Sequence, residues 1–381
     1  MNTVPPSVCP AREDLDDLDL LRRGLYGRHA VPRPLPVAEG SAAAALAIGS
    51  LDVVDPEGVP LVRLEEVERV GPGLVTGRPV WLDEPAPRPF QAWHLDAPVD
   101  LSTSHVRIVQ APGDVPATVA TGSTLLVLAS TSLDGGDGTD SVRAALDAAR
   151  SHDARVLVAP VPEDRGRRAA LLTTLGLEPA TLPRPPDEDI APGTARRETS
   201  GRGVVLMLTG LSGSGKSTIA RTVAIRLVEA GTPVTLLDGD VVRRHLTAGL
   251  GFSAADRRTN VRRIGWVAAE VGHHGGIAVC SPIAPDEQVR RDVAEMARSR
   301  GARFVLVHVA TPLEECERRD RKGLYARARR GEIPDFTGIS APYDTPEHPD
   351  LRLDTTGRTV QDCADEVLAL LGPTSGAPRA C

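Results

Sequence analysis

The C-terminal half of this 381-residue chain predicts an α/β fold in which helices cover both faces of a parallel sheet. From Gly203 onward, short apolar runs rich in β-formers alternate with stretches whose apolar residues recur at helical spacing. Ligands of such folds bind at the carboxyl ends of the strands. The expected strands are 204–208, 233–237, 276–281, 303–309 and 351–354, and a last helix is expected near 359–371.

A glycine-rich stretch follows the first of these strands and precedes a helical pattern that Gly231 ends. It fits G-x-x-x-x-G-K-[ST], in which glycines let backbone N–H groups converge on phosphates at a helix N-terminus. The flanking pattern disfavours the alternative, a plain strand-to-helix turn with a solvated lysine. We therefore predict a P-loop NTPase type of fold that binds a nucleoside triphosphate. The predicted phosphate contacts are Gly210, Leu211, Ser212, Gly213, Ser214, Gly215, Lys216, Ser217 and Thr218, with Lys216 reaching the β- and γ-phosphates and Ser217 offering a hydroxyl to Mg²⁺.

Composition excludes several classes of protein. The net charge of −7 gives no electrostatic footprint for nucleic acid or for an anionic membrane. No apolar run approaches the roughly 20 residues that span a bilayer, and the first residues lack the layout of a secretory signal. The five cysteines are scattered, without disulfide or zinc spacing. We expect a cytoplasmic protein that binds neither nucleic acid nor membrane.

Lysine is scarce. Of 44 basic residues only Lys216 and Lys322 are lysines, so arginine serves wherever a general cation is needed. A retained lysine suits a place where a compact ammonium fits and a planar guanidinium does not. Lys322 is therefore a candidate for a second anionic contact, the alternative being an accidental lysine.

The N-terminal half predicts two smaller pieces and a linker. A short amphipathic helix is expected between Arg12 and Arg28, followed by short β-like runs from about 46 to 98, with Trp81, Phe90 and Trp93 expected in their core. Strand candidates 125–128 and 155–158, with a helix between them, predict a reduced α/β segment. The proline-rich stretch that follows predicts a linker. The expected domains are 1–100, 101–178, a linker at 179–202, and 203–381.

Two carboxylates end the second C-terminal strand, in Asp238-Gly239-Asp240, and Arg243 follows one helical turn later. At a strand's carboxyl end near a phosphate loop, they could hold Mg²⁺ or accept a proton from an attacking hydroxyl. The alternative is an Asp-Gly turn with an N-cap aspartate. Further on, Arg257, Asn260 and Arg263 fall three residues apart, approximating one helical face that suits an anionic ligand or is simply solvated.

A dense basic stretch at 319–330 predicts a mobile lid that closes on phosphates. Phe252 and Phe336 belong to a chain with only four phenylalanines, and together they could clamp an aromatic base. Core packing is the alternative for either ring.

Residues 203–372 resemble adenylylsulfate kinase, the P-loop kinase that phosphorylates the ribose 3′-hydroxyl of adenosine 5′-phosphosulfate (APS). The resemblance rests on GLSGSGKST at 210–218, DGDxxR at 238–243, LGFS at 250–253, DRxxNxRRIG at 256–265, RDxKGLY at 319–325, FTGI at 336–339 and PYxxP at 342–346. Several motifs in the right order are far more specific than the phosphate loop alone.

This resemblance implies a role for each matching residue. Asp240 would be the base for the 3′-hydroxyl with Asp238 in support, and Lys216 and Lys322 would complete the catalytic set. Arg319 would contact ATP, and Mg²⁺ is the implied cofactor. The implied APS contacts are Asp238, Arg243, Phe252, Arg257, Asn260, Ile283, Lys322 and Phe336, with the two phenylalanines sandwiching the adenine.

Two positions depart from the family's pattern. Members often have Ile-Ser-Pro where this chain has Ile283-Ala284-Pro285, so no phosphoserine can form there and direct in-line transfer is expected. Trp266 stands where the family often has a glutamate, and we assign it no consequence.

The first 180 residues resemble ATP sulfurylase, on Asp55-Pro56-Glu57-Gly58-Val59-Pro60-Leu61 and the β-rich pattern, and a PUA-like module is implied. The family's histidine motif should follow the strand at 125–128, but this chain reads STSLDGGD at 130–137. We therefore expect a degenerate, truncated sulfurylase that serves in scaffolding, oligomer formation or regulation. The predicted function is APS phosphorylation by a homo-oligomer, a dimer or larger. The alternatives are a kinase of another small acceptor and a nucleotide-binding regulatory protein.

Overall fold

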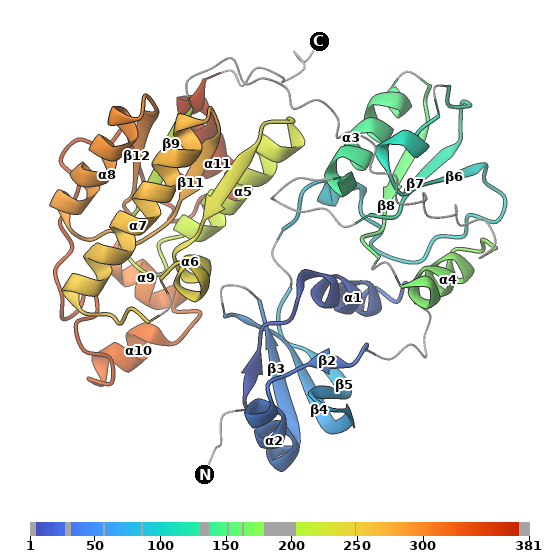
Figure 1. The fold of residues 1–381 in the computed structure, drawn as a ribbon, viewed down its shortest axis with the longest axis horizontal. Helices are drawn as coiled ribbons and strands as arrows, with labels where there is room; N and C mark the ends of the chain where they lie inside the picture. The colour runs from blue at the N-terminus through green and yellow to red at the C-terminus, as the bar shows by residue number, and fades with distance from the viewer. Residues whose placement is uncertain are drawn as a thin grey trace. The chain divides into compact units, whose positions relative to one another are not determined.

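The computed structural model divides the chain into two compact units, Met1–Ala191 and Pro192–Cys381. We describe each unit by itself (Figure 1). The linker predicted at 179–202 lies outside the described residues. The structure describes residues 5–26, 32–55, 58–84, 87–116, 118–129, 137–150, 152–161, 164–178, 203–247 and 249–372.

The β-rich part of the N-terminal unit is a five-stranded sheet in the order β1-β3-β4-β5-β2. Its strands β3, β4 and β5 pair antiparallel, and β1 pairs parallel with β3. The sequence did not predict α2, an alanine-rich helix that buries Ala42 and Ala45. The elements are β1 (Ser7–Val8), β2 (Leu35–Pro36), α2 (Glu39–Ile48), β3 (Ser50–Val54), β4 (Pro60–Gly71) and β5 (Leu74–Trp81).

The second part of this unit is a three-stranded parallel sheet, β6-β7-β8, that confirms the strands expected at 125–128 and 155–158. Parallel pairing requires a long crossover, and α3 supplies it between β7 and β8. Its elements are η1 (Gln91–Trp93), β6 (Val106–Val109), η2 (Pro112–Asp114), β7 (Thr124–Val127), α3 (Asp137–Arg150), β8 (Arg155–Val158) and α4 (Arg165–Thr174).

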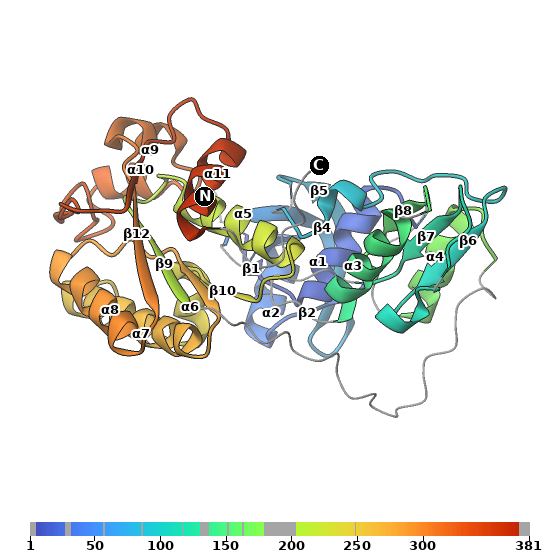
Figure 2. The same cartoon turned by 90° about the horizontal axis from the view of Figure 1, so that it is seen from above.

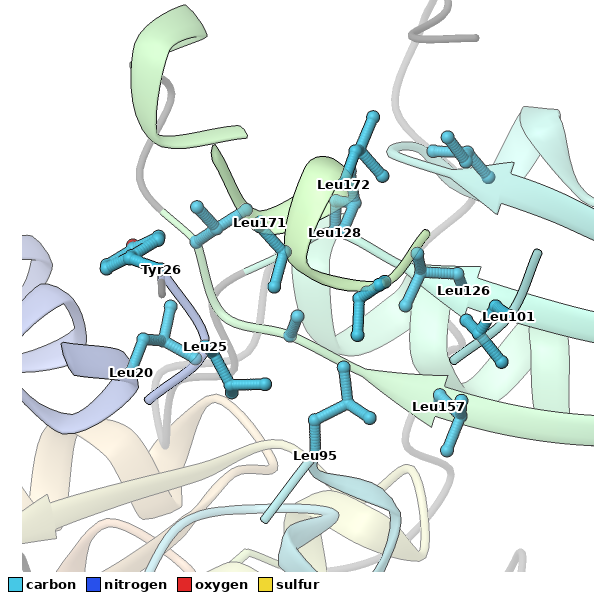
Figure 3. Close-up of a cluster of buried hydrophobic side chains, with 14 residues drawn as sticks. Leu20, Leu25, Tyr26, Leu95, Leu101, Leu126, Leu128, Leu157, Leu171 and Leu172 are labelled. Carbon is cyan, nitrogen blue, oxygen red and sulfur yellow. The ribbon is translucent and has the colours of Figure 1, made fainter. Parts of the chain in front are cut away.

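The first helix, α1 (Arg12–Arg22), contributes to the cores of both parts. Leu18 packs in the core of the five-stranded sheet. Leu20, and Leu25 and Tyr26 just after the helix, pack with Leu95, Leu171 and other leucines of the second part (Figure 3). The helix ends before the expected Arg28 because the chain turns at Gly24, whose φ is +72°.

Of the three aromatic residues expected in the core, only Phe90 lies there, at 2% exposed. Trp81 is 37% and Trp93 38% exposed, so the expectation was wrong for both. Trp81 ends the strand β5, and Trp93 packs edge-on against Phe90. Large aromatic rings of this kind are often only partly covered, and both indoles keep more than a third of their surface in solvent.

The C-terminal unit contains the predicted parallel sheet, in the order β10-β11-β9-β12-β13. All four pairings are parallel, and all six residues of the central strand β9 are buried, as expected for a strand covered on both faces. The strands are β9 (Val204–Thr209), β10 (Val234–Leu237), β11 (Ile277–Cys280), β12 (Arg303–Val309) and β13 (Leu351–Leu353).

Two pairs of helices cover the sheet: α5 packs with α11 on one face, and α7 with α8 on the other (Figure 2). The second pair is close, because a Cβ added at Gly265 would lie 2.5 Å from a Val293 methyl. None of the helices in the described residues is long and apolar enough to span a bilayer. The helices are α5 (Lys216–Glu229), α6 (Gly239–His245), α7 (Ala254–His273), α8 (Glu287–Ser299), α9 (Leu313–Arg319), α10 (Leu324–Arg329) and α11 (Val360–Leu371).

Candidate active site

The predicted phosphate loop connects β9 to α5, at the carboxyl edge of the central strand. Its three glycines have φ of +150° (Gly210), +72° (Gly213) and +98° (Gly215). These are values that side chains rarely adopt. A Cβ at Gly210 would also lie 2.3 Å from the Val309 carbonyl oxygen. The loop therefore requires glycine both for its backbone conformation and for its close approach to β12.

Lys216 begins α5, and its side chain is only 6% exposed. Its Nζ donates to the Leu211 carbonyl oxygen at 2.6 Å and lies 3.4 Å from Ser214 Oγ. The ammonium is thus held against residues of the loop itself. The next residue, Ser217, is partly exposed in the first turn of the helix.

Two threonines, one following β12 and one following β13, hold the loop in place. The hydroxyls of Thr311 and Thr355 donate to the Ser214 carbonyl oxygen at 3.0 and 3.1 Å. Arg319 donates to Thr355 Oγ1 at 2.8 Å and lies 3.5 Å from the Gly213 carbonyl oxygen. The residue that we expected to contact ATP is therefore fixed beside the loop.

The basic stretch expected as a lid comprises the end of α9, a turn that holds Lys322, and α10. Lys322 is exposed. Tyr325, 2% exposed, donates its hydroxyl to the Ser212 carbonyl oxygen at 2.8 Å. Burial raises the pKa of Tyr325, so the phenol stays protonated and remains a donor. This hydroxyl ties the lid to the phosphate loop.

On the other side of the loop, Asp238 follows β10 directly and is 3% exposed. It accepts a hydrogen bond of 2.7 Å from Ser281 Oγ, which follows the neighbouring strand β11. Asp240 is the second residue of α6, and the structure describes only its backbone. Both residues thus follow the strand end at which they were predicted.

Arg243 and Phe252 lie together. The guanidinium carbon is 4.4 Å from the centre of the ring, and Nη1 donates to the Gly251 carbonyl oxygen at 3.2 Å. Phe252 is 66% exposed, which excludes core packing as its role. Phe336 packs edge-on against Tyr325 at 5.0 Å between ring centres. The two rings therefore have different neighbours, and the adenine sandwich stays a prediction.

Along α7, the three residues that we expected on one face contact two different segments of the chain. Arg257 donates to the Asp335 carbonyl oxygen at 2.6 Å, next to Phe336. Asn260, 4% exposed, accepts a bond of 2.8 Å from the Thr247 hydroxyl. Arg263 is exposed and donates to the Leu246 carbonyl oxygen at 3.4 Å. A step of three residues falls about 60° short of a turn, so Arg263 has rotated away from Arg257.

The segment after β11 contains Ile283 and Ala284, the residue that departs from the family's pattern. The Ile283 carbonyl oxygen accepts a bond of 2.6 Å from the Thr209 hydroxyl. Ala284 has a φ of +45° and is 1% exposed. Its carbonyl oxygen accepts a bond of 2.7 Å from the buried Arg290.

The sequence did not predict the residues whose hydroxyl groups support the phosphate loop and Asp238. Ser281, Thr311 and Thr355 belong to none of the quoted motifs. Tyr325 is part of RDxKGLY, but no spacing could show that its hydroxyl reaches Ser212, 113 residues earlier. Among the described residues, no three His, Cys, Asp or Glu side chains form a group that could hold a metal ion.

Comparison with known proteins identifies the C-terminal unit. The sequence profile of the family described as Adenylylsulphate kinase matches residues 202–354. The chain is similar to the adenylyl-sulfate kinase of Chloroflexus aurantiacus, with 51% identity over 173 residues that cover 45% of this chain and 91% of that protein.

Two further similarities cover the same share of the chain. The sulfate adenylyltransferase of Neosartorya fischeri is 46% identical over 171 residues, which are 45% of this chain but only 30% of that protein. Among solved structures, the APS kinase of Mycobacterium tuberculosis in complex with AMPPNP and APS is 45% identical. It covers 45% of this chain and 99% of its own, with a TM-score of 0.44. Because the Chloroflexus kinase is 51% identical and 91% of its length is matched, the chain belongs to the adenylyl-sulfate kinase family.

Proposed function

We propose that this protein transfers the γ-phosphoryl group of ATP to the ribose 3′-hydroxyl of APS, giving 3′-phosphoadenosine 5′-phosphosulfate (PAPS) and ADP. One observation carries the proposal: a glycine phosphate loop with a buried lysine and a buried aspartate follow the carboxyl ends of two strands of one parallel sheet, and the chain after that aspartate brings a basic and an aromatic side chain together. These are the groups that a triphosphate donor and an anionic aromatic acceptor require.

The donor half is the loop from Gly210 to Thr218. Its backbone N–H groups and the N-terminus of α5 would bind the β- and γ-phosphates. Lys216 would exchange its bond to the Leu211 carbonyl oxygen for one to phosphate oxygens, so that its charge follows the transferring group. Arg319, fixed by Thr355, would contact the nucleotide.

The acceptor half lies on the side of β10, β11 and α7. Arg243, Arg257 and Asn260 would bind the phosphosulfate and the adenosine, and Ile283 would contact the nucleotide. Phe252 and Phe336 would flank the adenine. Asp240 would accept the proton of the 3′-hydroxyl, with Asp238 held in place by Ser281. Lys322 would reach the acceptor and the transferring phosphate from the lid.

The residues at this edge fit Mg²⁺ bound together with ATP. A serine hydroxyl and an aspartate carboxylate are hard oxygen ligands, and Mg²⁺ in kinases takes few ligands from the protein and the others from phosphates and water. Ser217 would be the protein's ligand. The ion would supply charge neutralisation at the phosphates.

Phosphoryl transfer is proposed to be direct. Ala284 lacks a hydroxyl and is 1% exposed, so this position offers no group that could carry a phosphate between donor and acceptor. The kinase chemistry is assigned to residues 203–381. The N-terminal unit is proposed to be a truncated sulfurylase relative without sulfurylase activity.

Incubation of the full-length protein with ATP and Mg²⁺, plus either APS or sulfate, tests this function. Chromatography of the nucleotides should show PAPS and ADP in equal amounts with APS, and neither APS nor PAPS with sulfate. A panel of other nucleosides and nucleotides as acceptors would identify a different kinase. ADP formation that no acceptor stimulates would instead support a regulatory nucleotide-binding protein. Product from sulfate would contradict the assignment of the N-terminal unit.

A further inference from the structure

Three side chains outside the proposed substrate contacts, the buried Thr209 and Arg290 and the half-buried Tyr343, join the donor side of the site to the acceptor side. Thr209, the last residue of β9, lies directly before Gly210 and is 0% exposed. Its hydroxyl is 2.6 Å from the Ile283 carbonyl oxygen and 2.9 Å from the Tyr343 hydroxyl. A carbonyl can only accept, so Thr209 donates to Ile283 and Tyr343 donates to Thr209.

Tyr343 is well suited to this contact. Burial raises its pKa, so that the phenol stays protonated and remains a donor. Its ring stacks on His308 of β12, with 5.8 Å between ring centres. The hydroxyl therefore points at Thr209 from a ring that is packed on the sheet. A second, longer link runs from the Gly210 N–H to the same Ile283 carbonyl oxygen, at 3.4 Å.

Arg290 holds the next residue of the same segment, Ala284. The side chain is 1% exposed and donates to the Ala284 carbonyl oxygen at 2.7 Å and to the Asp344 carbonyl oxygen at 2.6 Å. Glu287 balances its charge in an ion pair. Because Ala284 has a φ of +45°, its carbonyl is held in a direction that the backbone alone would not favour.

We infer that Thr209 and Tyr343, supported by Arg290, are positioning residues that fix the acceptor-binding segment at Ile283 against the start of the phosphate loop. This inference rests on the proposed function. In-line transfer needs donor and acceptor in a near-attack geometry, and a misplacement of about 1 Å can cost a hundredfold in rate. The Thr209–Ile283 bond joins the two segments that must keep this geometry.

A merely structural role makes a different prediction. If the two hydroxyls only satisfied buried polar groups, their removal would lower stability and leave the fate of the transferred phosphoryl group unchanged. If they align the two halves, their removal should let water compete with the 3′-hydroxyl. The diagnostic quantity is therefore the ratio of ADP formed to PAPS formed.

The test compares Thr209→Val, Tyr343→Phe and Thr209→Ser in the full-length protein with ATP, Mg²⁺ and APS. We expect Tyr343→Phe and Thr209→Val to lower kcat for PAPS formation about five- to a hundredfold. Both should raise the KM for APS more than the KM for ATP, and raise the ratio of ADP to PAPS above one. Thr209→Ser keeps the hydroxyl and should restore both the rate and the ratio.

The control is Thr359→Ala, which removes the side-chain cap of α11, a bond of 3.1 Å to the Asp362 N–H. It should lower the melting temperature while leaving the ratio of ADP to PAPS at one. If Tyr343→Phe and Thr209→Val behave like this control, the positioning role is refuted. If Thr209→Val does not fold, Tyr343→Phe against Thr209→Ser decides. A wild-type protein that makes no PAPS would refute the proposed function instead, before any variant is compared.

Discussion

Replacing Lys216 by arginine tests the phosphate loop more sharply than replacing it by alanine, because arginine keeps the charge. Nζ of Lys216 is 2.6 Å from the Leu211 carbonyl oxygen in a position only 6% exposed. A planar guanidinium is wider than an ammonium and cannot occupy the same space. We expect kcat/KM to fall by about 10²- to 10³-fold, a loss of roughly 3–4 kcal/mol of transition-state stabilisation. Lys216→Ala should lose at least two orders of magnitude.

The assay is steady-state PAPS formation at varied ATP and saturating APS, with melting curves to confirm folding. Arg226→Lys is the matched control, because Arg226 lies on the same helix and pairs with Asp365 at the surface. That exposed pair contributes little, so kcat/KM should stay within about twofold. A Lys216→Arg variant within tenfold of the wild type would refute both the assigned role of Lys216 and the argument from lysine scarcity.

Three further predictions each concern one side chain. Phe252→Ala should raise the KM for APS about tenfold and change the melting temperature by less than about 2 °C, because the ring is 66% exposed; an unchanged KM would remove Phe252 from the acceptor site. Tyr325→Phe removes the bond of 2.8 Å to the Ser212 carbonyl oxygen and should raise the KM for ATP about fivefold; a change in the KM for APS alone would contradict the link between lid and loop. Burial, together with Arg352 and Arg290, lowers the pKa of His308 to about 4, below its ordinary value of 6.5. As the pH falls, the unfolded chain therefore binds a proton at His308 at a higher pH than the folded protein does. The free energy of unfolding is highest above pH 6.5 and decreases as the pH drops toward 4. The decrease is about 2 kcal/mol after allowance for solvent screening. Urea unfolding at several pH values measures this, and His308→Gln should flatten the dependence between these pH values.

The sequence could predict the C-terminal sheet because its signals are local. A buried parallel strand is a continuous apolar run, and β9 shows six buried residues in succession just before the glycines. The carboxyl ends of parallel strands share one edge, so motifs that follow 204–208 and 233–237 had to lie near each other. The positions of Lys216 and Asp238 at that edge follow from this reasoning.

The contacts between distant segments could not be predicted in this way. The Thr209 and Tyr343 hydroxyls form a contact although they are 134 residues apart in the sequence. No periodicity in the sequence could indicate such a contact. Tyr343 lies in a motif, PYxxP, that specified no role for it. Side-chain exposure was also beyond reach: Trp81 and Trp93 were expected in the core on residue type alone, yet both are more than one-third exposed. Residue type predicts average burial, whereas the packing of each particular neighbour sets the actual value.

The N-terminal unit shows how one helix can join two sheets of different kinds. Three aspartates of α1 are nearly inaccessible, and each has an arginine beside it from another part of the unit. Arg88, 5% exposed, is 2.7 Å from Asp16 and 3.5 Å from Asp19, and Arg167 is 3.0 Å from Asp17. Removing one partner of a buried ion pair costs far more than the pair contributes, because the other charge is left unpaired.

We therefore expect the β-rich part and the parallel sheet to depend on each other for stability. Leu18 fills one core and Leu20 the other, and the turn after α1 adds Leu25 and Tyr26 to the second. A cut near residue 100 would separate Asp17 from Arg167 and leave the apolar side chains of α1 exposed on one part. The change of pattern near residue 100 thus marks a change of sheet type, from mostly antiparallel to parallel, within one compact unit.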